Sequence, residues 1–210
     1  MTPNEGLVMN ANPVSSAKVN HTLPSYAGTF GTAVVIVSLA ILFAASIIAY
    51  LVARHAHPDL PQAATPVGLW VSTALLIILS LTAHAAVGAA RQDNQSALRT
   101  TVIIWSVLAV GFLVAQTANW ITWAPPLFDR PPTGAESDSL SFYKMTFYVL
   151  TGLHAAHVVG GLIPLAFVWR NTMAGRYTPQ TFHPVRNCAL YWHFLDVVWI
   201  VMFLAIFVIG

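Results

Sequence analysis

Two hydrophobic stretches of this chain contain histidines and an aspartate, residue types that can hold a metal or carry a proton. The first stretch has His154 and His157, and the second has His193 and Asp196. Both pairs have an i, i+3 spacing, which places the two side chains on one face of a helix. An ionisable residue inside a membrane costs about 2.5–3.5 kcal/mol on insertion scales, so these pairs predict a role beyond membrane anchoring.

A metal or haem site is the sharper interpretation of the histidines. Such a site needs three or four ligands and an acceptor that orients each imidazole, and Asp196 is the single acid in the hydrophobic stretches. At about 1.5 Å per residue, His154 and His157 fall near mid-membrane, whereas His84 and His193 fall nearer one face. We therefore favour neutral histidines that hydrogen-bond across packed helices, with no catalytic, metal-binding or cofactor-binding residues in this chain.

Asp196 has three interpretations: a structural hydrogen-bond hub, an ion pair with a partner subunit, or a member of a proton relay. No second acid in the hydrophobic stretches continues a relay, so the first two are favoured, with the hub ahead. Gln116 and Asn119 are the polar residues of a further stretch, and we expect them and the histidines to be structural or interface residues.

Small residues predict where these helices pack closely. Ser80, His84 and Gly88 form one i+4 column, and Gly152, Ala156 and Gly160 form another. Both columns are expected to face other helices rather than lipid.

The elements that position these residues are five hydrophobic segments. The chain is 57% hydrophobic and 8% charged, against about 25% charged residues in soluble domains. A membrane-spanning helix needs about 20 apolar residues, and its backbone must satisfy its own hydrogen bonds. The sequence predicts an all-α membrane domain over residues 29–210 after a flexible polar tail over residues 1–28. Its five spans are expected at residues 30–53, 67–90, 100–123, 145–169 and 188–209.

Basic residues predict the orientation of the spans. Six lie in the tail and in the loops after the second and fourth spans, and three lie on the other side, which places the N-terminus in the cytoplasm and the C-terminus outside. The connection over residues 124–144 contains Pro125-Pro126 and Pro131-Pro132 and is expected to be extended. A net charge of +2 without a basic cluster excludes a nucleic-acid partner, and the single Cys188 excludes an intrachain disulfide.

Two motifs in the last two spans carry a family resemblance. Residues 147–161 read FYVLTGLHAAHVVGG, and residues 191–199 read YWHFLDVVW. They resemble the motifs of subunit III of haem-copper oxidases, the cytochrome c oxidase type and its quinol-oxidase relatives. The resemblance covers residues 28–210 and matches the short bacterial form with five helices. Its motif positions include Thr151, Gly152, Gly160, Tyr191, Trp192, Phe194 and Trp199.

The resemblance implies a non-catalytic subunit of a proton-translocating oxidase in the bacterial plasma membrane. Such a subunit packs on subunit I, in a complex that also contains subunit II, and it holds lipids. It supports oxygen reduction in aerobic electron transport, while haem and copper reside in the partner subunits. Further subunits of a respiratory supercomplex are conceivable partners on the same grounds.

The chain departs from the family pattern at two acidic positions. Aligning Tyr50 and Arg54 with the family's first span places Leu39 where relatives have glutamate. In the third span, Asn119 stands where relatives have a second glutamate. Leucine cannot hold a proton and asparagine can only hydrogen-bond, so any acid-dependent role at these positions is absent here.

Two alternatives stay open from the sequence. The accessory subunit of a nitric oxide reductase has a related fold and also lacks redox centres. An independent transporter of protons or small solutes is suggested by the intramembrane histidines and Asp196, but no pair of broken helices supports it.

Overall fold

The structure is a computed structural model that describes residues 25–56, 67–128 and 136–206, with side chains over residues 28–56, 67–121 and 148–206. The described part is all helical and has no strand. The five helices are α1 (Ser25–Ala56), α2 (Val67–Arg91), α3 (Gln95–Phe128), α4 (Glu136–Met173) and α5 (His183–Leu204). Each is long and apolar enough to cross a membrane. The prediction of an all-α bundle with five spanning helices is confirmed.

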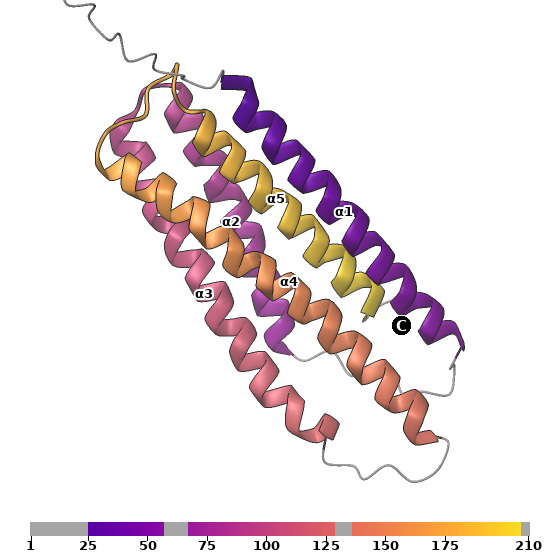
Figure 1. Cartoon of the computed structure of the whole chain (residues 1–210). Coiled ribbons are helices and arrows are strands. Elements are labelled where there is room, and N and C mark those ends of the chain that lie inside the picture. Colours follow the sequence, from indigo (N-terminus) through magenta and orange to yellow (C-terminus); the bar gives the residue numbers. More distant parts are fainter. Residues whose placement is uncertain (1–24, 57–66, 129–135, 207–210) are drawn as a thin grey trace, which may run out of the picture.

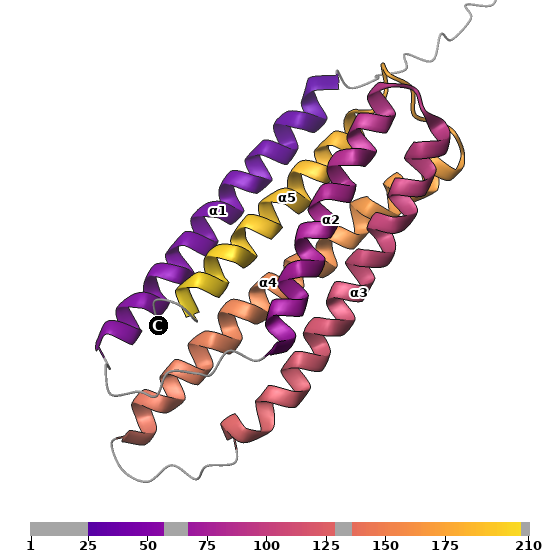
Figure 2. The same cartoon turned by 180° about the vertical axis from the view of Figure 1, so that it is seen from behind.

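Consecutive helices run in alternating directions, and α5 occupies the centre of the arrangement. It packs against α1, α2 and α4, while α3 packs against α2 and α4. Helix α1 lies at an edge, beside α5 and α4 (Figures 1 and 2). The start of α1, the α2–α3 turn and the α4–α5 loop lie at one end of the bundle, which we call the N-terminal end (Figure 1).

Local sequence signals set the helix boundaries at this end. The Asn94 side-chain oxygen accepts a hydrogen bond from the backbone N–H of Ala97 at 3.0 Å, which caps the start of α3. The turn before it places Asp93 at φ 55°, and Gly175 takes φ 65° just after α4. Pro184 lies in the first turn of α5, where its missing N–H removes no helical hydrogen bond.

The prediction of an extended connection over residues 124–144 is wrong in the described part. Helix α3 continues through Pro125-Pro126 to Phe128, and α4 already begins at Glu136. A proline near the end of a helix leaves the carbonyls one turn earlier without a helical N–H, and water satisfies such carbonyls at a membrane boundary. Residues 129–135 and 1–24 lie outside the described residues. Residues 25–28 form the first turn of α1 rather than part of the predicted tail.

Large aromatic side chains fill the centre of the bundle. Trp105 of α3 meets Trp192 of α5 edge-on, with ring centroids 6.4 Å apart. About two turns along, Phe112 meets Trp199 in the same way at 5.7 Å. These pairs place both tryptophans of the Tyr191–Trp199 motif in the core rather than at the surface.

Candidate functional site

The polar groups of Tyr191 and Trp192 join α5 to α4. The Tyr191 hydroxyl donates to the backbone carbonyl of His157 at 2.9 Å, and the Trp192 indole N–H donates to the carbonyl of Gly161 at 3.2 Å. A Cβ added to Gly161 would lie 2.9 Å from Cε1 of Tyr191. The helices therefore approach most closely where glycine lets both aromatic side chains reach the α4 backbone.

The predicted glycine column on α4 is only partly correct. A Cβ on Gly152 would meet Trp120, but Ala156 and Gly160 are exposed, and the close contact is at Gly161. A strict i+4 column rotates by about 40° at each step, so it leaves the packed face. The buried positions of α4 are instead separated mainly by a mixture of steps of three and four, at Leu150, His154, Val158, Gly161, Leu165, Val168 and Thr172, with Thr151 buried as well.

A second group of polar side chains lies between α2 and α5. The Ser80 Oγ is 2.7 Å from His193 Nδ1, and the same nitrogen is 3.9 Å from Asp196 Oδ2. The serine and the aspartate thus both lie beside the same ring nitrogen, Nδ1 of His193. In a nucleophilic triad they face opposite nitrogens of the imidazole, so this group is not arranged for nucleophilic catalysis.

The Asp196 carboxylate is buried, and neither oxygen has a hydrogen-bond partner among the described residues. The distance of 3.9 Å to His193 is too long for a hydrogen bond. The carboxylate lies beside His193 without a short hydrogen bond to it, and the role of Asp196 as a hydrogen-bond hub stays a prediction. The short contact of His193 in this group is with the Ser80 hydroxyl.

His154 and His157 lie beside each other on α4 but in different surroundings. His154 is buried, neither ring nitrogen has a partner in the described structure, and its ring packs 5.4 Å from that of Trp199. His157 Nδ1 is 2.7 Å from the carbonyl of Leu153 and donates to it, because a carbonyl can only accept. Phe43 of α1 packs edge-on against both rings.

The described intramembrane histidines do not form a cluster of metal ligands. His84 is exposed on α2, while Ser80 in the same column contacts α5. The expectation that this column faces other helices is thus met within the chain at Ser80 and stays a prediction at His84. Across the described residues, no three histidine, cysteine, aspartate or glutamate side chains lie close enough to hold a metal ion.

The polar residues of α3 contact α2. The Asn119 amide donates to the Ser72 hydroxyl at 3.0 Å, and a Cβ on Gly68 would overlap the Asn119 side chain. Gln116 is buried one turn earlier, and its Oε1 has no hydrogen-bond partner among the described residues. At Asn119 the chain therefore uses an amide to join two helices.

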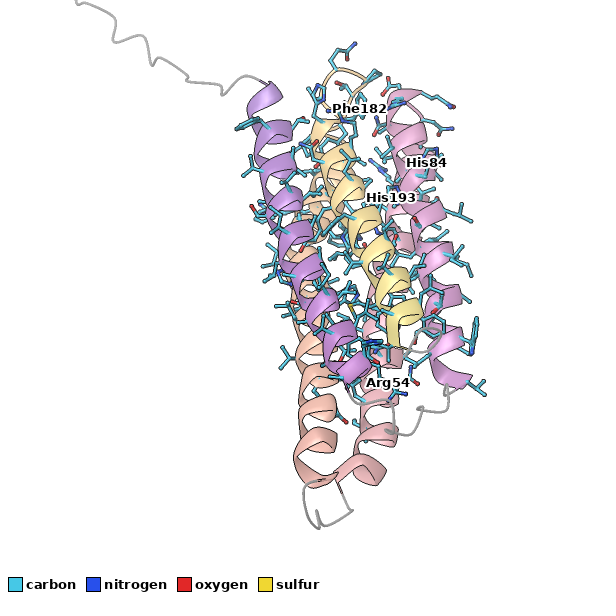
Figure 3. All side chains as sticks on the ribbon, turned by 90° about the vertical axis from the view of Figure 1, so that its right-hand side faces the viewer. Arg54, His84, Phe182 and His193 are labelled. Carbon is cyan, nitrogen blue, oxygen red and sulfur yellow. The ribbon has the colours of Figure 1, made fainter. Side chains whose placement is uncertain are left out.

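The remaining motif positions are mostly packing residues. The Trp199 indole N–H donates to the Thr73 hydroxyl of α2 at 3.1 Å. Leu39 and Phe194 are half-buried and pack against the core. Tyr50 and Thr151 are buried, and Arg54 is half-buried near the end of α1 (Figure 3).

Contacts at the N-terminal end were not predicted from the sequence. Arg186 of α5 donates to Thr29 of α1 at 3.1 Å, and the Thr29 hydroxyl lies 3.3 Å from Asn187 Oδ1. The Gln95 amide donates to the carbonyl of Tyr177 at 2.8 Å and so joins the α2–α3 turn to the α4–α5 loop. Burial raises the pKa of the Tyr177 hydroxyl. In the sequence, Arg186 indicates only the orientation of the spans, because a basic residue near a span marks the cytoplasmic side.

The fold and these contacts define a class: a multi-pass membrane protein whose signature polar side chains bond its own helices. The model of the family described as cytochrome c oxidase subunit III matches residues 11–210, and the chain belongs to this family. It is accordingly an accessory subunit of a haem-copper oxidase and a multi-pass protein of the bacterial plasma membrane.

Individual relatives agree with the family match. The chain is 28% identical over 209 residues to the cytochrome c oxidase subunit 3 of Thermostichus vulcanus, which covers 98% of both chains. It is 29% identical to the protein of that name from Synechocystis sp., over 86% of this chain and 75% of the relative. It is 31% identical to the probable cytochrome c oxidase subunit 3 of Nocardia farcinica, over 84% of this chain and 85% of the relative. These relatives give no support to the nitric oxide reductase or transporter alternatives.

Proposed function

We propose that this chain packs against the catalytic subunit I of its oxidase, in a complex that also contains subunit II. In that place it supports oxygen reduction and proton translocation by its partners. Haem and copper belong to those partners, and this chain contributes a scaffold.

One observation carries this proposal: the family's signature side chains bond neighbouring helices of the chain. Tyr191 and Trp192 bond the α4 backbone, and His193 and Trp199 bond hydroxyl groups of α2. The side chains of the motif form interhelical bonds worth about 0.6–2 kcal/mol each, and these bonds stabilise a rigid bundle. Such a bundle can present its outer surface to a larger partner.

The distribution of arginines supports a cytoplasmic N-terminus. The N-terminal end of the bundle carries five of the described arginines, whereas Arg54 lies at the opposite end. The five are Arg91, Arg99, Arg170, Arg176 and Arg186. Under the positive-inside rule, the N-terminal end faces the cytoplasm and α5 ends outside. Labelling of single cysteines at Thr178 and at His55 with a membrane-impermeant maleimide, in intact cells of a Cys188→Ala background, tests this. We expect labelling at position 55 alone, and the reverse pattern would overturn the orientation.

Bound phospholipid is part of the proposed role. Helix α3 exposes apolar side chains such as Ile104, Val107 and Val114, which suit acyl chains. Native mass spectrometry of the complex should show phospholipid leaving together with this chain. If lipid remained with the other subunits after this chain dissociates, lipid holding would have to be assigned to them.

Affinity purification in a mild detergent tests the main proposal. A tag at the C-terminus of this chain should recover a haem- and copper-bearing subunit I and a copper-bearing subunit II in equal amounts, together with any supercomplex subunits. Spectra of the recovered complex should show a haem–copper centre. A purified complex of the two redox subunits that never contains this chain would overturn the proposal.

A further inference from the structure

The exposed face of α2 combines apolar side chains with an unpaired imidazole. We propose that the α2 face formed by Ile77, Leu81 and His84 docks a membrane-spanning helix of another subunit of the oxidase complex. That helix presents a hydrogen-bonding side chain to His84. The inference rests on the proposed function, because it requires that the chain works within a complex.

His84 is the residue that separates a protein partner from lipid. It is exposed on the chain, and no described residue bonds its ring. It lies seven residues before Arg91, the end of α2, and therefore about 10 Å inside the helix end. Ionisable residues at such depth almost always face protein or a polar cavity, because lipid offers no hydrogen-bond partner. The surface around His84 is therefore covered by protein in the assembled state.

The outer face of α3 provides the contrast within the same molecule. Its exposed side chains include Ile103, Val107, Val110 and Val114, all of them apolar. The hydroxyl of Thr117 on this face donates to its own helix at 2.8 Å. Between Ile103 and Thr117 the exposed hydroxyl of this face is thus satisfied within its own helix, and lipid suffices to cover this part of α3.

The spacing on α2 fits a helix as the occupant. Ile77, Leu81 and His84 follow an i, i+4, i+7 pattern, with exposed fractions of 52% and 65% for the two apolar residues. This is the pattern by which one helix contacts another. The face continues onto α5, because Ser80, one turn before His84, bonds the partly exposed His193 (Figure 3).

Photo-crosslinking in intact membranes tests the occupant. A benzoylphenylalanine is placed at Leu81 in the full complex, and the matched control is at Val107 of α3. The two native side chains are 65% and 66% exposed. We expect an adduct with another oxidase subunit from position 81 and adducts with lipid from position 107. Lipid adducts or a dimer of this chain from position 81, or equal protein adducts from both positions, would overturn the inference.

Substitution of His84 tests the polar contact. His84→Ala should lower the amount of this chain retained with the haem-bearing subunits after detergent washing by about three- to tenfold, the range of a single intramembrane hydrogen bond. His84→Gln should restore much of the retention, because the amide still donates and accepts. The control is Leu81→Ala, which removes apolar area and leaves the imidazole in place.

Co-purification distinguishes a failure of the proposed function from a failure of the inference about His84. If the unmodified chain does not co-purify with haem-bearing subunits, the proposed function fails. If it co-purifies and His84→Ala is retained as well as the unmodified chain, the function stands and the inference about His84 is wrong.

Discussion

Helices α1 and α5 both cross the membrane, yet they are used in opposite ways. In the most apolar part of each helix, 11% of the α1 residues are buried within the chain, against 50% of the α5 residues. Helix α1 is the more exposed and lacks any charged residue before Arg54, while the central α5 carries His193 and Asp196 in the middle of its sequence. In a membrane, apolar side chains suit the outside and polar side chains need neighbouring helices, so polarity marks the centre.

This comparison explains why the signature motif lies on α5. Its aromatic and polar side chains bond α4 and α2, whereas the serines of α1 bond their own backbone. Ser38 donates to the carbonyl of Val34 at 2.9 Å, and Ser46 donates to that of Leu42 at 2.8 Å. These two serine hydroxyls thus add nothing to the contacts between helices, whereas the hydroxyl of Thr29 at the start of α1 bonds α5.

A carboxylate on α1 gives the largest expected effect. Leu42→Glu places a charge on the exposed side of α1 and should cost about 2.5–3.5 kcal/mol of insertion free energy. Leu39→Glu should cost less, because Leu39 packs against the core one turn from Phe43, which contacts His157. Membrane-inserted yields of the two variants measure the difference, and equal yields would show that the inner face of α1 offers no partner for a carboxylate.

Overpacking of the α4–α5 contact should come next. Gly161→Val forces a side chain against Tyr191 and Trp192 and should destabilise the bundle by about 1–3 kcal/mol. The matched change in α1 is Gly31→Val, where a Cβ would meet no atom within 4 Å. Unfolding of the detergent-solubilised chain by increasing SDS measures both. A Gly31→Val variant as unstable as Gly161→Val would remove the distinction between the two helices.

The Ser80–His193 bond should give a smaller effect. A double-mutant cycle with Ser80→Ala and His193→Ala should yield a coupling free energy of about 0.6–1.7 kcal/mol. Ser38→Ala on α1 serves as the control, because its hydroxyl bonds its own helix. SDS unfolding supplies the four free energies. Coupling indistinguishable from zero would mean that Ser80 and His193 do not stabilise the α2–α5 contact.

The smallest effect is expected at the N-terminal end. Gln95→Ala removes the bond from the side-chain amide to the Tyr177 carbonyl and should cost about 0.5–1.5 kcal/mol. The measured quantity is hydrogen exchange of the α4–α5 loop, which should become faster while exchange in the core of α5 stays unchanged. Faster exchange throughout α5 would show that this turn supports the whole bundle.

The sequence by itself determined the five helices, their membrane character and the family. Helix formation is local, because each backbone N–H bonds a carbonyl four residues away, and a membrane-spanning segment has few alternatives. Long runs of apolar residues therefore predicted the five helices, and the two motifs predicted the family. Helix ends do not follow from these patterns, because α3 continues through Pro125-Pro126, which predict an extended segment.

Tertiary structure alone decided which polar residues meet. His193 and Asp196 share a face, yet the bond forms between His193 and Ser80 on another helix. Gly161 rather than Gly160 makes the close contact, and His84 lies outside the bundle. These outcomes depend on how far each helix is rotated about its axis and on the depth at which it meets its neighbours. A shift of one residue turns a helix by about 100°, so no local pattern determines them.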